Sequence, residues 1–288
     1  MTADRESAAA VKPLDQQTIL VTGSTAGLGL GVARRLASHG ATVLVHGRDP
    51  RRLERALVAI GGGRHGDRLH GLLADLASLD AARRLARDVE RRFDRLDALV
   101  NNAGVASVSG PRRESADGHE LTFAVNYLSG FLLTLDLLPL LRSSAPARIV
   151  NVASVGQRAI DFDNPMLEHS YEGFRAYAQS KLAQVMFTFE LAERLADAGE
   201  SGVTVNALHP ATLMDTGMVR AAFGTPRSTV AEGADATLRL LAAPELEAVS
   251  GRYYEGDEEG TADSQAYDES ARRRLWALSV ELCGVDLA

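Results

Sequence analysis

The sequence has few of the residues that build disulfide-linked, metal-binding or membrane-spanning proteins. Its single cysteine, Cys283, cannot form an internal disulfide, which fits a reducing cytoplasm. None of the seven histidines falls at a metal-ligand spacing such as H-x-x-x-H, so we expect no metal site. No apolar run approaches the roughly 20 residues that span a bilayer, and the polar N-terminus lacks the apolar segment of a secretory signal.

An excess of basic residues is also missing. The formal net charge of -7 argues against a nucleic-acid partner, because such proteins usually carry a basic face. Hydrophobic residues make up 45% of the chain and charged residues 24%, which is ordinary for a globular protein. We therefore expect a cytoplasmic globular protein without a nucleic-acid partner.

Short β-branched runs alternate with longer stretches of helical period along the chain. The predicted strands lie within 18–22, 41–47, 68–76, 96–104, 147–154, 202–210 and 251–255. The predicted helices cover 28–38, 50–60, 79–93, 117–143, 177–198 and 265–282. Residues 1–15 read as a flexible tail and 16–288 as one domain. This order predicts an α/β fold, a Rossmann-type doubly wound and mostly parallel sheet of seven strands, which binds ligands at the carboxyl ends of its strands.

A glycine-rich turn, TGSTAGLGLG (22–31), joins the first predicted strand to the first helix. Glycines at 23, 27 and 29 permit a tight turn and a close approach to a pyrophosphate, which the free N–H groups of the helix start would bind. The alternative is a flexible glycine loop without a ligand. The cofactor-binding candidates in this turn are Gly23, Ser24, Thr25, Gly27, Leu28 and Gly29.

The end of the second strand, VHGRDP, bears on which dinucleotide would bind. An acid there would bind the ribose hydroxyls of NAD, but Gly47 stands in that place and Arg48 follows. Because arginine matches a phosphate with its fork of donors, we predict NADP(H) rather than NAD(H). The alternative for Arg48 is a solvated surface charge. Asp49 is expected to cap the helix that opens at Pro50.

Two further strand ends carry residues suited to the same crevice. Asp75 and Leu76 follow the third strand, where Asp75 could accept a hydrogen bond from an adenine amine. Asn102, Ala103 and Gly104 follow the fourth, where Asn102 could bind backbone and Gly104 could let the cofactor approach. As plain turns both would be unremarkable, so their placement at successive strand ends carries the argument.

The stretch YAQSK places Tyr177 and Lys181 one helical turn apart, on one face of a helix. A nearby ammonium would stabilise a phenolate, so Tyr177 could exchange a proton with a carbonyl or alcohol oxygen beside a hydride transfer. Ser154, at the end of the fifth strand, could be the second donor to that oxygen. Asn126 lies in a largely apolar helix and could hold a water that links Lys181 to solvent.

Taken together, these motifs resemble the short-chain dehydrogenase/reductase family over residues 16 to 285. The resemblance implies a nicotinamide cofactor and a catalytic group of Asn126, Ser154, Tyr177 and Lys181. It also implies a homodimer or homotetramer that packs the helices containing 117–143 and 177–198, as in many members.

The chain departs from the usual family pattern between Ser154 and Tyr177, which are 23 positions apart. The extra segment is expected to loop out over the site, and it is similar to the insertion of the retinol dehydrogenase and WW-domain oxidoreductase-like branch. That branch favours NADP and lipophilic alcohols or ketones. Pro210 fits the family motif after the sixth strand, although Ala211 replaces its glycine. Thr216 is the candidate for the nicotinamide carboxamide contact.

Residues 211–230 are predicted to form a substrate lid, in which methionines and Phe223 line an apolar pocket or pack as an ordinary helix. EGDEEG (255–260) is expected to be a solvated acidic turn. The predicted function is an NADP(H)-dependent interconversion of an alcohol and a carbonyl on a hydrophobic small molecule. A catalytically idle NADP-binding regulator or scaffold is the alternative.

Overall fold

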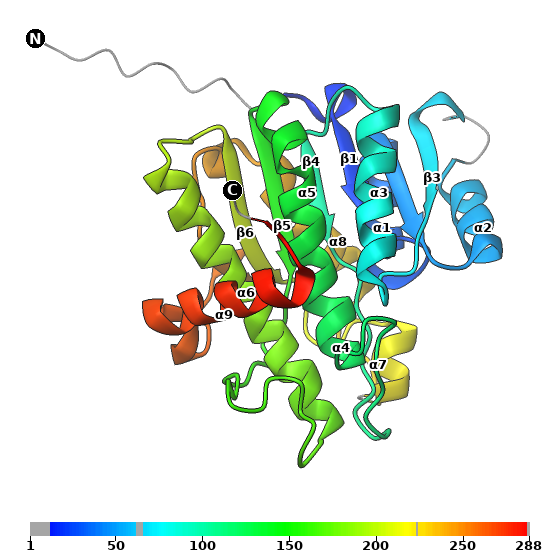
Figure 1. The fold of residues 1–288 in the computed structure, drawn as a ribbon. Helices are drawn as coiled ribbons and strands as arrows, with labels where there is room; N and C mark the ends of the chain where they lie inside the picture. Colours follow the sequence, from blue (N-terminus) through cyan, green and yellow to red (C-terminus); the bar gives the residue numbers. More distant parts are fainter. Residues whose placement is uncertain (1–11, 62–65, 223, 287–288) are drawn as a thin grey trace, which may run out of the picture.

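A twisted sheet of eight strands runs through the centre of the protein (Figure 1). The computed structural model describes residues 12–61, 66–222 and 224–286. Within them the strands lie in the order β3-β2-β1-β4-β5-β6-β7-β8, and every neighbouring pair is parallel except β7 and β8. The strands are β1 (Thr18–Val21), β2 (Thr42–Gly47), β3 (Leu69–Leu73), β4 (Ala98–Asn101), β5 (Ala147–Val152), β6 (Val203–His209), β7 (Tyr253–Glu255) and β8 (Glu258–Glu259).

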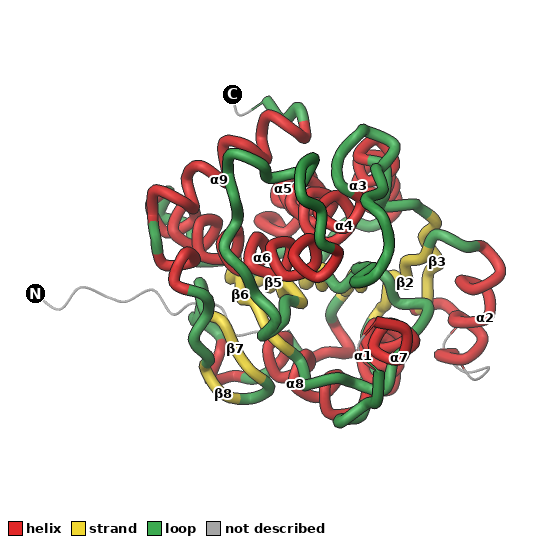
Figure 2. The backbone as a smooth tube through the Cα atoms, turned by 90° about the horizontal axis from the view of Figure 1, so that it is seen from below, coloured by secondary structure: helices red, strands yellow, loops and turns green. Residues whose placement is uncertain are grey.

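Helices cover both faces of this sheet, as the view from below, toward the ends of the strands, shows (Figure 2). On one face lie α3, α5, α6 and α9, and on the other lie α1, α2 and α8. The helices are α1 (Gly27–Ser38), α2 (Pro50–Gly61), α3 (Leu79–Arg92), α4 (Leu121–Phe123), the π-helical η3 (Ala124–Leu128), α5 (Ser129–Ser143), α6 (Gly173–Asp197), α7 (Gly217–Ala222), α8 (Val230–Ala242) and α9 (Glu269–Cys283). Short 3-10 turns are η1 (Leu14–Gln16), η2 (Gly66–Arg68), η4 (Pro244–Leu246) and η5 (Ser264–Tyr267).

The central strands are buried on both faces, which explains their nearly continuous apolar sequence. Every residue of β1, β4, β5 and β6 is buried. The strand order turns back between β1 and β4, because β2 and β3 lie on one side of β1 and the later strands on the other. In such sheets a crevice opens at the carboxyl ends of the two strands where the order reverses. This architecture confirms the predicted Rossmann-type fold.

Several helix ends are fixed by side chains that the sequence supplies at the right positions. The Ser78 hydroxyl caps α3 by accepting a hydrogen bond from the Ala81 amide at 3.3 Å. Thr229 and Glu232 form a reciprocal capping box at the start of α8. Helix α9 ends at Gly284, whose φ of 58° is the left-handed conformation that favours glycine.

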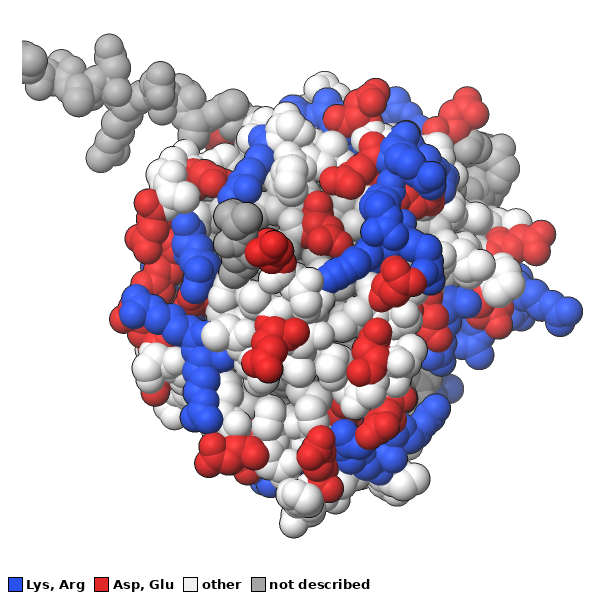
Figure 3. Space-filling model, in the orientation of Figure 1, with Lys and Arg blue, Asp and Glu red and all other residues white. Residues whose placement is uncertain are grey.

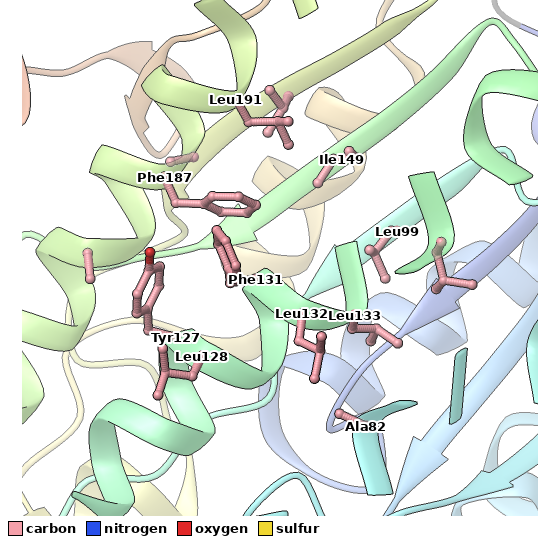
Figure 4. Close-up of a cluster of buried hydrophobic side chains, with 14 of the residues drawn as sticks. Ala82, Leu99, Tyr127, Leu128, Phe131, Leu132, Leu133, Ile149, Phe187 and Leu191 are labelled. Atoms are coloured by element: carbon pink, nitrogen blue, oxygen red, sulfur yellow. The ribbon is translucent and has the colours of Figure 1, made fainter. Parts of the chain in front are cut away.

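The larger apolar core lies between the sheet and helices α5, α6 and α9, where Tyr127, Phe131 and Phe187 pack with their rings inclined to one another (Figure 4). The rings of Phe131 and Phe187 lie 5.2 Å apart, and Phe131 also meets the Trp276 ring of α9 at 5.2 Å. The Tyr127 hydroxyl is buried and lies 2.6 Å from the Ser279 hydroxyl, which gives its polar end a partner. Helix α9 is therefore joined to the core by both apolar and polar contacts.

The structure corrects four details of the sequence prediction. The sheet has an eighth strand, because the expected acidic turn folds back and pairs Glu258 with Glu255. The helix predicted over 117–143 starts at Leu121 and contains the π-helical η3. The sequence reading did not predict α8 as a separate helix. Residues 12–15 belong to the folded domain rather than to a tail, because Lys12 donates to buried Asp97 at 3.1 Å; residues 1–11 lie outside the described part.

The continuous helix Leu121–Ser143 is long and apolar enough to cross a membrane by length and composition. The prediction that no apolar run approaches this length is therefore wrong. However, 72% of the most apolar 18-residue window of this helix is buried inside the protein, where the helix packs against the sheet. A core helix of this kind is weak support for a membrane span. Cytoplasmic localisation stays a prediction.

Acidic and basic side chains are interspersed on the face shown in Figure 3, with basic side chains gathered over α3. Three arginines of this helix are exposed and paired with acids of the same helix, Arg84 with Asp80 and Arg91 and Arg92 with Asp88. Exposed pairs of this kind contribute little to stability. No continuous basic surface appears on this face, and the absence of a nucleic-acid partner stays a prediction.

We expect Phe131→Ala to lower the free energy of unfolding by about 3–5 kcal/mol, because the ring is fully buried and leaves a cavity. Urea denaturation followed by circular dichroism measures this change. Val58→Ala is the control, since Val58 is 72% exposed and such surface changes stay within about 0.5 kcal/mol. Similar losses in both variants would contradict the central place given to the aromatic cluster.

Candidate active site

A cavity of about 590 Å³ opens at the carboxyl ends of the central strands, where the strand order reverses. Its walls come from the glycine turn, the ends of β2 to β6, the first turns of α6 and the segment 209–219. These pieces are far apart in sequence and meet because parallel strands end at the same edge of the sheet.

The glycine turn leaves no room for side chains at its two closest contacts. Gly23 has a φ of +64°, and a Cβ there would lie 2.8 Å from the Ala103 Cα. A Cβ on Gly29 would lie 2.5 Å from the side-chain Nδ2 of Asn102 and the same distance from the Gly23 carbonyl oxygen. The turn therefore packs directly against the end of β4, with the start of α1 facing the cavity.

Thr22 and Asn102 join the ends of β1 and β4. The Thr22 hydroxyl accepts from the Asn102 amide at 2.9 Å and from the Ala103 amide at 3.0 Å. In return the Asn102 side chain donates to the Thr22 carbonyl at 2.7 Å and to the Gly23 carbonyl at 3.2 Å. Asn102 thus binds backbone at the strand ends, as the sequence predicted.

His46 connects the glycine turn to β3. Its Nδ1 accepts from the Gly23 amide at 3.0 Å, so the proton sits on Nε2, which donates to the Ala74 carbonyl at 3.1 Å. Burial lowers the pKa of His46 to about 4, although the Ala74 bond and nearby Asp75 oppose this shift. The imidazole is therefore neutral at physiological pH, and this neutral form is the one that holds the turn.

The end of β2 presents two cations and no acid to the cavity. Arg48 and Arg52 are exposed side chains that line it, and Asp49 caps α2 by accepting from the Arg52 amide at 2.8 Å, as predicted. Gly47 is buried, and a Cβ at this position would come within 2.4 Å of the Thr25 methyl. Any side chain at position 47 would therefore require the Thr25 side chain to move.

Tyr177, Ser154 and Lys181 meet on the opposite wall. All three side chains line the cavity, and the Tyr177 hydroxyl forms a hydrogen bond with the Ser154 side chain. The Lys181 ammonium lies 5.7 Å from the centre of the Tyr177 ring. Lys181 donates to the Val152 carbonyl at 2.8 Å and to the Gln184 side chain at 2.9 Å, which anchors it behind the tyrosine.

Burial dominates the acid–base behaviour of this group. It raises the pKa of Tyr177, while the Ser154 hydrogen bond acts in the opposite direction. Burial also lowers the pKa of Lys181 to about 7. The sequence argument expected Lys181 to lower the pKa of Tyr177; the structure instead gives a tyrosine that stays protonated at neutral pH. A protonated phenol is suited to donate a proton to a carbonyl oxygen.

Asn126 lies behind this wall in the π-helical turn η3. Its Oδ1 accepts from the Val105 amide at 2.7 Å, and its Nδ2 donates to the Val105 carbonyl at 3.1 Å and to the Ser180 hydroxyl at 2.9 Å. Ser180 in turn donates to the Tyr177 carbonyl at 2.7 Å. Asn126 therefore holds the loop after β4 against the helix that carries Tyr177, and its predicted water relay stays a prediction.

The segment after β6 closes one side of the cavity. Pro210, Ala211 and Thr216 line it, and the Thr216 methyl would lie 3.2 Å from a Cβ on Gly27, so this segment reaches the glycine turn. Thr216 also caps α7 by accepting from the Val219 amide at 3.2 Å. The predicted pocket residue Phe223 lies outside the described residues.

The cavity brings together all but two of the predicted site residues. Those that line it are Gly23, Thr25, Gly27, Leu28, Gly29, Arg48, Asp75, Leu76, Asn102, Ala103, Gly104, Ser154, Tyr177, Lys181, Pro210 and Thr216. Asn126 and Ser24 lie outside the lining. Ser24 is buried and donates to the Val21 carbonyl at 2.7 Å, so it shapes the turn from behind. Of the extra segment after Ser154, residues 157–175, Phe174 lines the cavity and the other residues do not, so the segment reaches the site only near its end.

Three ionisable residues of the site were missed by sequence reasoning. Arg52 follows Arg48 by four positions, a spacing that could have revealed it. His46 precedes Gly47 at the strand end but has no motif of its own. His209 lines the cavity at the end of β6, and burial together with the charge of Lys181 lowers its pKa to about 4. Both histidines are neutral because they are buried, and their burial depends on the fold and not on a sequence motif.

The sequence pattern of the family described as short chain dehydrogenase matches residues 17–226 of this chain. The match contains the glycine turn, Ser154, Tyr177 and Lys181. The chain belongs to the short-chain dehydrogenase family. It is thus an NAD(P)-dependent oxidoreductase, which confirms the predicted class of enzyme.

Relatives place the chain more closely within the family. Mouse (Mus musculus) retinol dehydrogenase 13 is 40% identical over 293 residues, covering 94% of this chain and 85% of that protein. Mouse polyprenol dehydrogenase is 39% identical over 289 residues with the same coverage. These matches confirm the resemblance to the retinol dehydrogenase branch.

Solved structures share the fold. An uncharacterised protein from Mycobacterium paratuberculosis has a TM-score of 0.73 and 28% identity, with 95% of each chain covered. The NADP active-site complex of RhlG from Pseudomonas aeruginosa has a TM-score of 0.69 and 27% identity, covering 85% of this chain and 98% of that one. Both support the single-sheet α/β architecture.

We expect acidification to destabilise the protein partly through His46. Its pKa is about 4 in the folded state and about 6.5 when unfolded, so only the unfolded state gains a proton between these values. Stability should therefore fall as the pH drops from about 6.5 to 4, by up to about 3 kcal/mol from this residue. Urea unfolding across this range, compared with His46→Asn, measures the contribution. An equally steep loss in the variant would show that other groups cause it.

Proposed function

We propose that the protein is an NADP(H)-dependent oxidoreductase that interconverts a carbonyl and an alcohol on a lipophilic small molecule, with Tyr177 as general acid and base. The observation that carries this proposal is the meeting of Tyr177, Ser154 and Lys181 in the cavity that also contains the glycine turn. One wall is suited to proton transfer and the other to a dinucleotide. Neither wall alone would favour this reaction.

The residues present fit a dinucleotide. The close approach of Gly23 and Gly29 to the end of β4 leaves a backbone cradle that a side chain would fill. The start of α1 would supply free N–H groups for a pyrophosphate, Asp75 could accept from an adenine amine, and Thr216 and Lys181 could hold the nicotinamide part; all of these residues line the cavity. When bound, a nicotinamide supplies or accepts the hydride.

Two observations support NADP(H) rather than NAD(H). Arg48 and Arg52 both line the cavity beside the end of β2, where a phosphate on the adenosine ribose would find two guanidinium groups. Position 47, which is the place of the residue that binds ribose hydroxyls in NAD enzymes, is a glycine packed against the Thr25 methyl and carries no acid. RhlG, whose structure is that of an NADP active-site complex, shares this fold.

The protein's own groups are arranged for proton transfer to an oxygen. Tyr177 is protonated at neutral pH because burial raises its pKa, so it can donate to a carbonyl oxygen as negative charge develops there. The Ser154 hydroxyl is the second donor, held beside Tyr177 by their mutual hydrogen bond. Lys181, with a pKa lowered to about 7, can return a proton toward the tyrosine side of the cavity.

The remaining lining favours an apolar substrate. Val155, Phe174, Leu213, Met214 and Met218 are apolar residues that line the same cavity. Methionine side chains adapt to varied apolar shapes. Two relatives, retinol dehydrogenase 13 and polyprenol dehydrogenase, are named after lipophilic alcohols.

We expect Tyr177→Phe to abolish most turnover while NADPH binding stays near the wild-type level. Loss of a general acid costs about 10²–10⁴ in rate, and the phenyl ring keeps the packing of the cavity wall. Stopped-flow oxidation of NADPH with a panel of hydrophobic ketones measures turnover, and fluorescence titration measures binding. Near-normal rates would place the proton donor elsewhere. Normal NADPH binding by the wild type without turnover of any ketone would favour an idle regulator.

We expect Arg48→Ala to weaken NADPH binding roughly tenfold or more and to leave NADH almost unchanged, because a charged hydrogen bond contributes about 1.5–3 kcal/mol. Arg51→Ala is the matched control, since Arg51 is an exposed neighbour on α2 that does not line the cavity. Isothermal titration with both cofactors gives the four affinities. Equal losses for NADPH and NADH would overturn the assignment of Arg48.

A further inference from the structure

The loop that carries Ser154 is fastened to the C-terminal part of the chain by a glutamine. Three residues after Ser154, the Gln157 side chain donates from Nε2 to the Ser154 carbonyl at 2.7 Å. Its Oε1 accepts from the Asp263 amide at 2.9 Å. One amide group therefore connects the backbone of Ser154 with a segment more than 100 residues away.

The C-terminal end of this connection is itself rigid. Asp263 accepts from the Gln265 amide at 3.0 Å and so caps the 3-10 turn η5, which leads into α9. The Gln265 side chain forms a second tie, because its Oε1 accepts from the Ile160 amide at 2.6 Å and its Nε2 donates to the Ile160 carbonyl at 3.1 Å. This second tie holds the same loop but does not touch Ser154.

The position of the Ser154 hydroxyl depends on the turn that Gln157 closes. Its Oγ accepts from the Gly156 amide at 3.1 Å and is hydrogen-bonded to Tyr177. A Cβ on Gly156 would lie 3.5 Å from the Ser154 Oγ and 3.8 Å from the Tyr177 ring, so this turn packs closely against both groups. A shift of the Ser154 carbonyl would rotate the peptide that carries these contacts.

We propose that Gln157 is a positioning residue that holds the Ser154 hydroxyl against Tyr177 from an anchor in the C-terminal segment. This inference rests on the proposed function of Ser154 and Tyr177. Both ends of the Gln157 amide are used, so neither a pure acceptor nor an apolar side chain can replace it. Gln157 acts through Ser154 and does not line the cavity.

The test compares Gln157→Glu with Gln265→Glu. Gln157→Glu keeps the acceptor for the Asp263 amide but sets a carboxylate oxygen against the Ser154 carbonyl. Gln265→Glu makes the same change of charge on the second tie, away from Ser154. Gln157→Met serves as a neutral second variant of similar length, in case the charged variant does not fold.

We expect both Gln157 variants to lower kcat about tenfold or more. Complete loss of a donor to the reacting oxygen lowers kcat roughly hundredfold, and a misplaced Ser154 hydroxyl should cause part of that loss. The KM for NADPH should not change, because the cofactor wall lies on other strands. In the direction of alcohol oxidation, the pH at which the rate rises should move upward, because the Ser154 hydrogen bond that lowers the pKa of Tyr177 is weakened. Gln265→Glu should keep the wild-type kcat and pH profile.

A near-wild-type kcat in both Gln157 variants, or an equal loss in Gln265→Glu, would overturn the proposal. Hydrogen exchange of the Gly156 amide separates this outcome from a failure of the proposed function. If the wild type turns over no substrate, the oxidoreductase proposal fails, and exchange alone decides the role of Gln157. Faster exchange of Gly156 in Gln157→Met supports positioning, and unchanged exchange overturns it.

Discussion

The hydrogen bonds between Thr22 and Asn102 are the constraint on which the site depends. They join β1 to β4 at the point where the strand order reverses, and they fix how closely the glycine turn approaches the next strand end. Gly23 and Gly29 are required by this closeness rather than by flexibility, since a Cβ at either position would collide with the end of β4. The cofactor wall follows from one tight junction of two parallel strands.

The opposite wall depends on burial. Lys181 and Tyr177 are both buried, and burial disfavours the charged form of each side chain. The pKa of Lys181 is therefore lowered and that of Tyr177 is raised. Because the pKa of Lys181 falls to about 7 while that of Tyr177 rises above its ordinary value, proton transfer from the ammonium to a phenolate is favourable, so Lys181 can restore the protonated tyrosine after it has donated. The sequence showed the spacing of the two residues but not the burial that sets their chemistry.

Sequence reasoning predicted the features that are local in the chain. Strand alternation, the glycine turn and the i, i+4 pair of Tyr177 and Lys181 each occupy a short stretch, so their patterns were readable. The features it missed are contacts between distant segments: the neutral His46 beneath the glycine turn, and Gln157 bound to Asp263. It also missed β8, because a strand of two glutamates has no apolar pattern and exists only by pairing with β7.

Helix α9 has a consequence for how copies of the chain could associate. The family resemblance implies that subunits pair through the helices that contain residues 117–143 and 177–198. In this protein α9 lies across α6, its Trp276 packs on Phe131 and Phe187, and Arg194 of α6 covers the indole at 4.2 Å (Figure 1). A second copy that approached from this side would meet the C-terminal helix α9 before it reached α6. Residues of α9 would therefore form the surface on which it docks.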